Sequence, residues 1–288
     1  MEIISRIPTL QPRRPEAHKG DYGRILIIGG SVGMSGAAAL AGRAALRAGA
    51  GLVRIATARS ALPIVASIDP CYTTIGLPED HGGRIDNSAI DQILDAIGDS
   101  DVVVFGPGIG QGSGLRSITA RLIGIKDVRL LIDADGLNNL ARLKDWHTQL
   151  RTRPVLTPHP GEMVRLWASV TDAPRPQDRV QWACGLVEKV PSVLVLKGAG
   201  TVVTDGQRLY VNTTGNPGMA TAGAGDVLSG IIAALMGQGL SDLDAAVLGT
   251  YIHGLAGDIA ADAKGQISLV ATDLIEALPA AFRSLSGN

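Results

Sequence analysis

The segment from Asn216 to Asp226 holds the residues of this chain that are best suited to catalysis. It reads Asn-Pro-Gly-Met-Ala-Thr-Ala-Gly-Ala-Gly-Asp and leads into the apolar run Val227–Met236, which predicts a helix. The free N–H groups and the dipole at the start of a helix favour an anion. Three small residues at this start let the N–H groups converge without obstruction: Gly223, Ala224 and Gly225.

A carboxylate stands beside this expected anion site. Asp226 could take a proton from a hydroxyl group while the loop holds a phosphoryl group. Phosphoryl transfer requires this combination of positioning, charge stabilisation and a base. A simpler interpretation is an aspartate that caps a helix after a flexible glycine turn. That interpretation suffices for Asp226 alone, whereas the whole segment favours catalysis.

Other loops at expected strand ends, and the start of the first long helix, carry further candidates. They are, in chain order, Ala37 and Ala38, Gly108, His159 and Glu162, and the segment Lys197-Gly-Ala-Gly-Thr201. Taken singly, each also has a structural interpretation. These are close packing for the alanines, an ordinary glycine turn, a structural histidine, a helix-start carboxylate, and a hairpin turn with a solvated lysine.

Short β-rich runs alternate with alanine-rich helical patterns along most of the chain. Runs such as Val102–Phe105 are apolar throughout, as in strands covered on both faces. After Val193, three short runs separated by glycine-containing turns predict an antiparallel meander at one sheet edge, and three helices follow. We therefore expect an α/β fold in one domain, residues 1–288, with a mostly parallel sheet between helical layers. Ligands of such sheets bind beyond the carboxyl ends of the strands.

Composition excludes several classes of function. Lys and Arg number 26 against 27 Asp and Glu, only 3% of residues are aromatic, and no basic run occurs, so a nucleic-acid partner is not expected. The N-terminus lacks an apolar signal region, and the longest apolar stretch, Val227–Leu240, is too short to cross a membrane. We expect a cytoplasmic protein in which Cys71 and Cys184 are small buried hydrophobic residues.

Two common nucleotide-binding motifs are absent from the sequence. No GxxxxGK[ST] occurs, and residues 106–111 do not complete a GxGxxG. The chain instead resembles the ADP-dependent (S)-NAD(P)H-hydrate dehydratases, a branch of the ribokinase-like superfamily, from about residue 18 to the last helix. The segments that carry the resemblance are His18–Gly23, Gly29–Ser31 with Ser35–Ala38, Gly106–Gly110, Asp133–Gly136, Thr157–Glu162, Lys197–Thr201 and Asn216–Asp226. One departure is Ala224, where the family often has a hydroxyl residue.

The resemblance implies a ribokinase-like three-layer α/β/α sandwich and a lyase that repairs nicotinamide cofactors. The substrate would be the S epimer of hydrated NADH or NADPH, which carries a hydroxyl on C6 of the reduced ring. ADP would phosphorylate that hydroxyl, and elimination of phosphate would restore NADH or NADPH, leaving AMP and phosphate. Asp226 would be the base. The anion hole would be formed by Gly223, Ala224 and Gly225.

The resemblance also implies binding roles for individual residues. Substrate contacts would come from Ala37, Ala38, Gly108, His159 and Asp226. The nucleotide would contact Lys197, Gly198, Ala199, Gly200, Thr201, Asn216 and Gly225. Glu162 would hold Mg²⁺ through a water molecule, since magnesium favours carboxylate oxygen and keeps its waters. His18 and Lys19 receive only a weak role near phosphate or in a subunit contact, and Asp133 and Asp135 receive none.

Further expectations concern partners and rivals. The resemblance implies a homotetramer that cooperates with a separate NAD(P)H-hydrate epimerase, because many relatives carry an epimerase domain before the dehydratase region. Here residues 1–17 form only an N-terminal extension. One rival is a kinase of the same fold that acts on a small alcohol of the hydroxyethylthiazole or hydroxymethylpyrimidine type. Another is a non-catalytic module that binds nucleotide without turnover.

Overall fold

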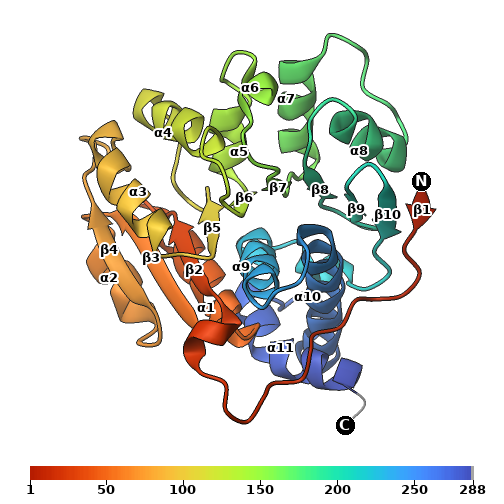
Figure 1. Cartoon of the computed structure of the whole chain (residues 1–288). Helices are drawn as coiled ribbons and strands as arrows, with labels where there is room; N and C mark the ends of the chain where they lie inside the picture. Colours follow the sequence, from red (N-terminus) through yellow and green to blue (C-terminus); the bar gives the residue numbers. More distant parts are fainter. Residues whose placement is uncertain (287–288) are drawn as a thin grey trace.

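The apolar runs of the sequence pair into one ten-stranded sheet in the computed structural model, which describes residues 1–286 (Figure 1). The order across the sheet is β1-β10-β9-β8-β7-β6-β5-β2-β3-β4. The strands are β1 (Glu2–Ile3), β2 (Arg24–Ile28), β3 (Leu52–Ala58), β4 (Thr73–Leu77), β5 (Val102–Phe105), β6 (Leu130–Ile132), β7 (Val155–Leu156), β8 (Val193–Leu196), β9 (Val202–Thr204) and β10 (Arg208–Val211).

Helices follow most of these strands. They are α1 (Ser35–Arg47), α2 (Leu62–Ile68), α3 (Ile90–Gly98), α4 (Ser113–Ile123), α5 (Asp135–Leu140), α6 (Trp146–Gln149), α7 (Pro160–Val170), α8 (Arg179–Val187), α9 (Ala224–Gly237), α10 (Asp242–Lys264) and α11 (Ala271–Ser286). Three 3₁₀ turns are η1 (Lys19–Tyr22), η2 (Asn87–Ala89) and η3 (Pro217–Met219).

Strands β2 to β8 pair in parallel with one another. Strand β8 then pairs in antiparallel with β9, and β9 with β10, which gives the expected antiparallel meander. The meander is not the sheet edge, however, because β1 pairs in parallel with β10. A two-residue strand has no periodicity that a sequence can show. In Figure 1 the chain then runs from β1 across α10 and α11 to η1, and Ile4, Ile7 and Leu10 pack on the core there.

Each strand sends alternate side chains to two separate cores. In β2, Ile25 and Ile27 join the core under α1, α2 and α9 to α11, whereas Leu26 and Ile28 join the core under α3 to α8. This period of two is the strand pleat, and both faces are apolar because helices cover both. The predicted three-layer α/β/α architecture is confirmed.

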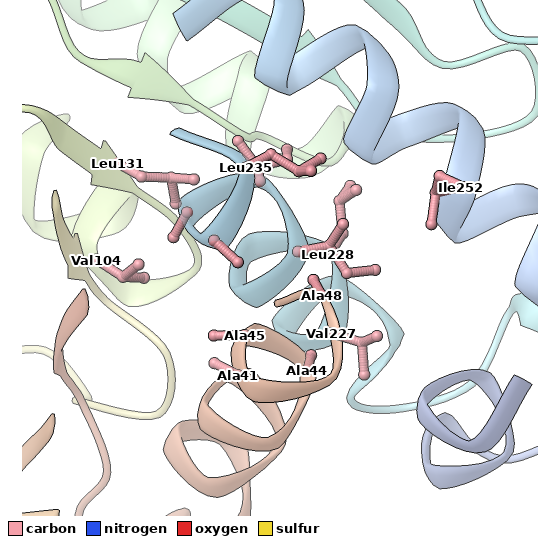
Figure 2. Close-up of a cluster of buried hydrophobic side chains, with 14 of the residues drawn as sticks. Ala41, Ala44, Ala45, Ala48, Val104, Leu131, Val227, Leu228, Leu235 and Ile252 are labelled. Carbon is pink, nitrogen blue, oxygen red and sulfur yellow. The ribbon is translucent and has the colours of Figure 1, made fainter. Parts of the chain in front are cut away.

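Helices α1 and α9 pack closely against each other in the core that contains Ile25 and Ile27. Figure 2 shows Ala41, Ala44 and Ala45 of α1, with Ala48 at its C-terminal end, on the side of α9, while Val104 and Leu131 come from the sheet. A Cβ on Gly230 of α9 would lie 2.1 Å from the carbonyl oxygen of Ala41. Small residues let the two helices approach, which explains a core with few aromatic residues.

Two features of the chain differ from what the sequence predicted. Cys71 is exposed and Cys184 is partly exposed, so neither is the fully buried hydrophobic residue that was expected. Helix α6 was not expected, since four residues carry no helical period. Within residues 1–286, no helix is both long enough and apolar enough to cross a membrane.

Gly230→Ala is expected to lower the free energy of unfolding by about 1–3 kcal/mol, because the added methyl group must push α1 away from α9. The matched control is Gly36→Ala in α1, where a Cβ meets nothing within 4 Å. That change should leave stability unchanged or raise it by up to about 1 kcal/mol. Denaturant unfolding measures both. Equal effects of the two substitutions would contradict the proposed packing.

Candidate active site

The loops named in the sequence meet at one edge of the sheet. Strands β2, β5, β6, β7 and β8 are parallel, so their carboxyl ends share that edge. The chain direction across the sheet reverses between β2 and β5, and ligands of open α/β sheets bind at this switch point. The two loops there are joined, because Gly30 N donates to Pro107 O at 2.8 Å and Ser31 Oγ donates to Gly108 O at 2.8 Å.

Helix α9 begins at the same edge with the geometry of an anion site. Gly223 caps it with φ +88°, a conformation that favours glycine, and a Cβ at that position would lie 2.5 Å from Leu40 Cδ1, so the Leu40 side chain would have to move. The first helical hydrogen bond recorded runs from Val227 N to Gly223 O. The N–H groups of Gly225 and Asp226 therefore have no acceptor inside the helix and are free for a ligand.

Asp226 lies in the first turn of α9 and is partly exposed. Burial raises the pKa of its carboxyl from 3.8 to about 7, with a further contribution from the Asp133 carboxylate, while Lys197 acts in the opposite direction. A carboxyl with this pKa is partly ionised near neutral pH. That is the range in which a general base works best.

A buried charge cluster lies directly behind this helix turn. Lys197 Nζ donates to Asp133 Oδ1 at 2.6 Å and lies 3.9 Å from Glu162 Oε2. It also lies 3.2 Å from the position of a Cβ on Gly225. Burial opposes the charge of Lys197, but Asp133 and Glu162 outweigh it and raise the pKa of the ammonium. One cation therefore stands among three carboxylates, counting Asp226.

His159 and Glu162 form a reciprocal cap at the start of α7. His159 Nδ1 accepts from Gly161 N at 2.9 Å, and Glu162 Oε2 accepts from His159 N at 2.8 Å. Since Nδ1 is an acceptor, the neutral ring carries its proton on Nε2, on a half-exposed side chain. Burial, helped by Lys197, lowers the pKa of His159, and burial raises the pKa of Glu162.

The expected substrate contacts at α1 divide into two cases. Ala37 is partly exposed, whereas Ala38 is fully buried, and the substrate contact expected at Ala38 stays a prediction. Gly108 is buried too, with φ +63°, and a Cβ there would lie 2.4 Å from Met34 O. Glycine is thus required there by the protein's own backbone, which packs the switch-point loop against the start of α1.

The expected nucleotide loop follows β8. Its backbone from Gly198 to Gly200 is exposed, and Thr201 closes it because Oγ1 donates to Gly198 O at 2.9 Å. Asn216 has other partners: its amide nitrogen donates to Asp258 at 3.0 Å, and its oxygen accepts from Gly218 N at 3.0 Å. The Asn216 side chain therefore shapes the η3 turn.

Sequence reasoning missed two residues of the site. His253 on α10 lies 2.9 Å from Ala224 O, and burial lowers its pKa to about 4, so the ring is neutral and donates to that carbonyl. Asp133 had no role assigned, yet its Oδ2 also accepts from the buried Ser229 of α9 at 2.7 Å. The signals for Asp133 were its place directly after a buried strand and its motif in the family resemblance, neither of which assigned it a role, and a helix residue such as His253 gave none.

A magnesium ion fits this site in a limited way. Within residues 1–286, no three His, Cys, Asp or Glu side chains are placed to bind one metal ion together. Magnesium, however, often takes one carboxylate together with waters and phosphate oxygens. Glu162 offers such a carboxylate in a cluster with excess negative charge. Two surface hollows of about 410 and 480 Å³ are lined by none of these residues. The candidate site is therefore defined by the start of α9 and the charge cluster, and not by a hollow.

Comparison with solved structures shows that the fold is ribokinase-like. A ribokinase-like superfamily protein from Enterococcus faecalis superposes with a TM-score of 0.81 at 26% identity, over 96% of this chain and 92% of that one. The family model described as NAD(P)H-hydrate dehydratase matches residues 25–280, and the chain belongs to this family. The resemblance inferred from the motifs is confirmed.

Individual relatives agree with this assignment. The bifunctional NAD(P)H-hydrate repair enzyme Nnr of Moorella thermoacetica is 45% identical over 96% of this chain and 52% of its own length, and that of Escherichia coli is 43% identical over 93% and 49%. The chain spans about half the length of the curated relatives it matches. The ADP/ATP-dependent NAD(P)H-hydrate dehydratase of Bacillus subtilis, co-crystallised with ATP and Mg²⁺, has a TM-score of 0.81 at 28% identity, over 96% and 94%.

Asp226→Asn is expected to stabilise the fold at pH 8. The Asp226 carboxyl ionises near pH 3.8 in the unfolded chain and near 7 in the folded one, so the free energy of unfolding falls as pH rises from about 4 to about 7. Asparagine does not titrate and removes this loss, which amounts to at most about 4 kcal/mol above pH 7. Denaturant unfolding at several pH values measures the gain.

The gain in the free energy of unfolding of Asp226→Asn over wild type should shrink as pH falls from 7 to 4. The control is Asp95→Asn on the exposed face of α3, which should change stability little at any of these pH values. A loss of stability at pH 8 in Asp226→Asn, or a gain independent of pH, would show that the carboxyl does not have the raised pKa.

Proposed function

We propose that this chain is an ADP-dependent dehydratase that returns the S epimer of hydrated NADH or NADPH to NADH or NADPH. The observation that carries the proposal is the start of α9, where free N–H groups of Gly225 and Asp226 accompany a carboxyl with a pKa near 7. Membership of the NAD(P)H-hydrate dehydratase family supports the choice of substrate. Residues 1–288 would act as one dehydratase domain.

In this proposal Asp226 takes the proton of the C6 hydroxyl as the hydroxyl oxygen bonds to the terminal phosphorus of ADP. The bond between that phosphorus and the AMP oxygen breaks. The free N–H groups of Gly225 and Asp226, with that of Gly223, would hold the charge of the transferring group, whereas Ala224 N already donates to Thr221 O at 3.4 Å. The lone pair of the ring nitrogen then expels phosphate from C6 and leaves an iminium, and loss of a C5 proton to the solvent forms the C5–C6 double bond that restores the reduced ring. Hydroxide alone leaves poorly, which is why a phosphate must be formed first.

Other groups of the site would bind and orient the reactants. His159 Nε2 lies 3.3 Å from Glu162 Oε1, so a substrate oxygen would share this N–H with Glu162, and Ala37 and the backbone at Gly108 would border the substrate. The exposed Gly198, Ala199 and Gly200 backbone, with Lys197 and Thr201, would hold the nucleotide together with Gly225. Asn216 would act through the η3 turn. Glu162 would hold Mg²⁺ through water, and the ion would reduce the negative charge of the phosphates.

The wider setting is part of the proposal as well. We expect a cytoplasmic homotetramer, with no membrane or nucleic-acid partner, that works with an NAD(P)H-hydrate epimerase able to supply the S epimer. The bifunctional name of the longer relatives supports such cooperation. His18 and Lys19 stay candidates for a phosphate or subunit contact, since His18 caps η1 at an exposed position.

The alternative hypothesis, a small-alcohol kinase of the same fold, has less support. A hydroxyethylthiazole kinase from Pyrococcus horikoshii has a TM-score of 0.61 at only 15% identity, which shows the common fold and nothing about the acceptor. A nucleotide-binding module without catalysis would leave the raised pKa of Asp226 without a use.

The decisive assay mixes S-hydrated NADH, ADP and Mg²⁺ with the protein and follows NADH by its absorbance. Wild-type protein should form NADH, and Asp226→Asn should lower kcat by about 10²–10⁴-fold, because general-base catalysis contributes that much. Asp95→Asn on α3 serves as the control and should retain full activity. Absence of NADH from either epimer would contradict the proposal, and phosphorylation of a small alcohol would favour the kinase.

The pH dependence of kcat/KM provides a separate prediction. Because this quantity reports the free enzyme, it should rise with pH through an acid limb near pH 7, where Asp226 loses its proton. The residual rate of Asp226→Asn should lack that limb. A limb near pH 4 in the wild type would indicate an ordinary exposed carboxyl and exclude Asp226 as the titrating base.

A further inference from the structure

Asp133 is a carboxylate with both oxygens occupied. It is 1% exposed, Oδ1 accepts from Lys197 Nζ at 2.6 Å, and Oδ2 accepts from Ser229 Oγ at 2.7 Å. Its backbone N donates to Phe105 O at 3.1 Å in the neighbouring strand end. A side chain held in this way offers no free oxygen to a substrate. Its chemistry must therefore reach the site through Lys197.

The Lys197 ammonium lies where a phosphoryl group would need a cation. It is 3.2 Å from the Cβ position of Gly225, in the turn of α9 whose N–H groups are free. Because Ser229 belongs to α9 itself, the chain of contacts from Ser229 through Asp133 to Lys197 ties the ammonium to the helix that carries the anion site. A lysine on its own has several flexible bonds and would not keep this place.

We propose that Asp133 is a positioning residue that holds the Lys197 ammonium behind Gly225 and prevents it from pairing with Asp226. The inference rests on the proposed function, since it assigns a charge to the phosphoryl-transfer site. Held there, the ammonium stabilises the charge of the transferring group, and the Asp226 carboxyl stays a competent base. Released, the ammonium would pair with Asp226 and make it a weaker base.

The charges around Asp226 show why this position matters. Asp133 lies at the end of β6, Glu162 on α7 and Lys197 at the end of β8, and all three act on the Asp226 carboxyl. Arg165 of α7 acts on His159 and Glu162 instead, and His253 on α10 is neutral. An incoming nucleotide adds negative charge to carboxylates that already outnumber the cation. Moving the Lys197 ammonium by a few ångströms would therefore change both the stabilisation of the transferring phosphoryl group and the strength of Asp226 as a base.

A purely structural ion pair is the alternative explanation. Buried ion pairs often contribute little net stability, and removal of one partner leaves an unpaired charge that destabilises the fold. That explanation predicts a change in unfolding alone. The positioning role predicts a change in catalysis that disappears once Lys197 is already absent, which a double-mutant cycle measures.

The experiment compares wild type, Asp133→Asn, Lys197→Met and the double variant in the NADH assay, with kcat/KM followed against pH. Asp133→Asn should lower kcat about tenfold to a hundredfold and move the acid limb to lower pH, because the Asp133 charge that raises the pKa of Asp226 is lost and the freed ammonium pairs with Asp226. Ser229→Ala, which keeps that charge, separates the two causes. Lys197→Met should lower kcat, raise the KM for ADP and move the limb to higher pH. The double variant should have a kcat no lower than that of Lys197→Met.

Asp242→Asn is the matched control, because it breaks the ion pair with Arg129 at the carboxyl end of α9, away from the site. It should reduce stability without moving the acid limb. If Asp133→Asn does not fold, Ser229→Ala, which removes one hydrogen bond of Asp133, should move the limb and kcat in the same direction by a smaller amount. Multiplicative losses in the double variant, or an unmoved limb in folded Asp133→Asn or Ser229→Ala, would overturn the inference. Absence of NADH formation by wild type would instead refute the proposed function.

Discussion

An excess of carboxylates around one buried ammonium is the constraint on which the site depends. Asp133, Glu162 and Asp226 lie around Lys197 near the start of α9, where the N–H groups of Gly225 and Asp226 have no acceptor inside the helix. The ammonium reduces the repulsion of an anion by the cluster, while burial, together with the surplus of carboxylates, raises the pKa of Asp226 to about 7. A site with only one of these properties would bind phosphate without a base, or hold a base without binding phosphate.

The fold brings these groups together by packing small residues tightly. Helices α1 and α9 lie side by side because Gly230 and the alanines of α1 leave no side chain between their backbones. Gly223 meets Leu40 of α1, so both helices begin at the carboxyl edge of the sheet. The strand ends that carry Asp133 and Lys197 reach the same edge because the strands are parallel. Few aromatic residues are needed in such a core.

Much of this arrangement could be predicted from local signals. Continuous apolar runs predicted the buried strands, glycine turns predicted the meander, and the small-residue segment before Asp226 predicted a helix start with free N–H groups, the candidate anion site. Local patterns could not show contacts between residues far apart in the chain. Ser229 and Asp133 are 96 residues apart and His253 and Ala224 are 29 apart, so their pairing follows only from the folded sheet and helices. The motif that contains Ala38 likewise gave no information about the burial of that residue, which is complete.

The central claim is that the C6 oxygen of the hydrated cofactor becomes part of the released phosphate. It is tested most directly by labelling that hydroxyl with ¹⁸O, supplying ADP and Mg²⁺, and recording the mass of the phosphate formed. Phosphoryl transfer to the hydroxyl followed by elimination places one ¹⁸O in each phosphate, with one NADH and one AMP formed alongside it. Label found in water instead of phosphate would contradict phosphorylation of the substrate and, with it, the account of this site.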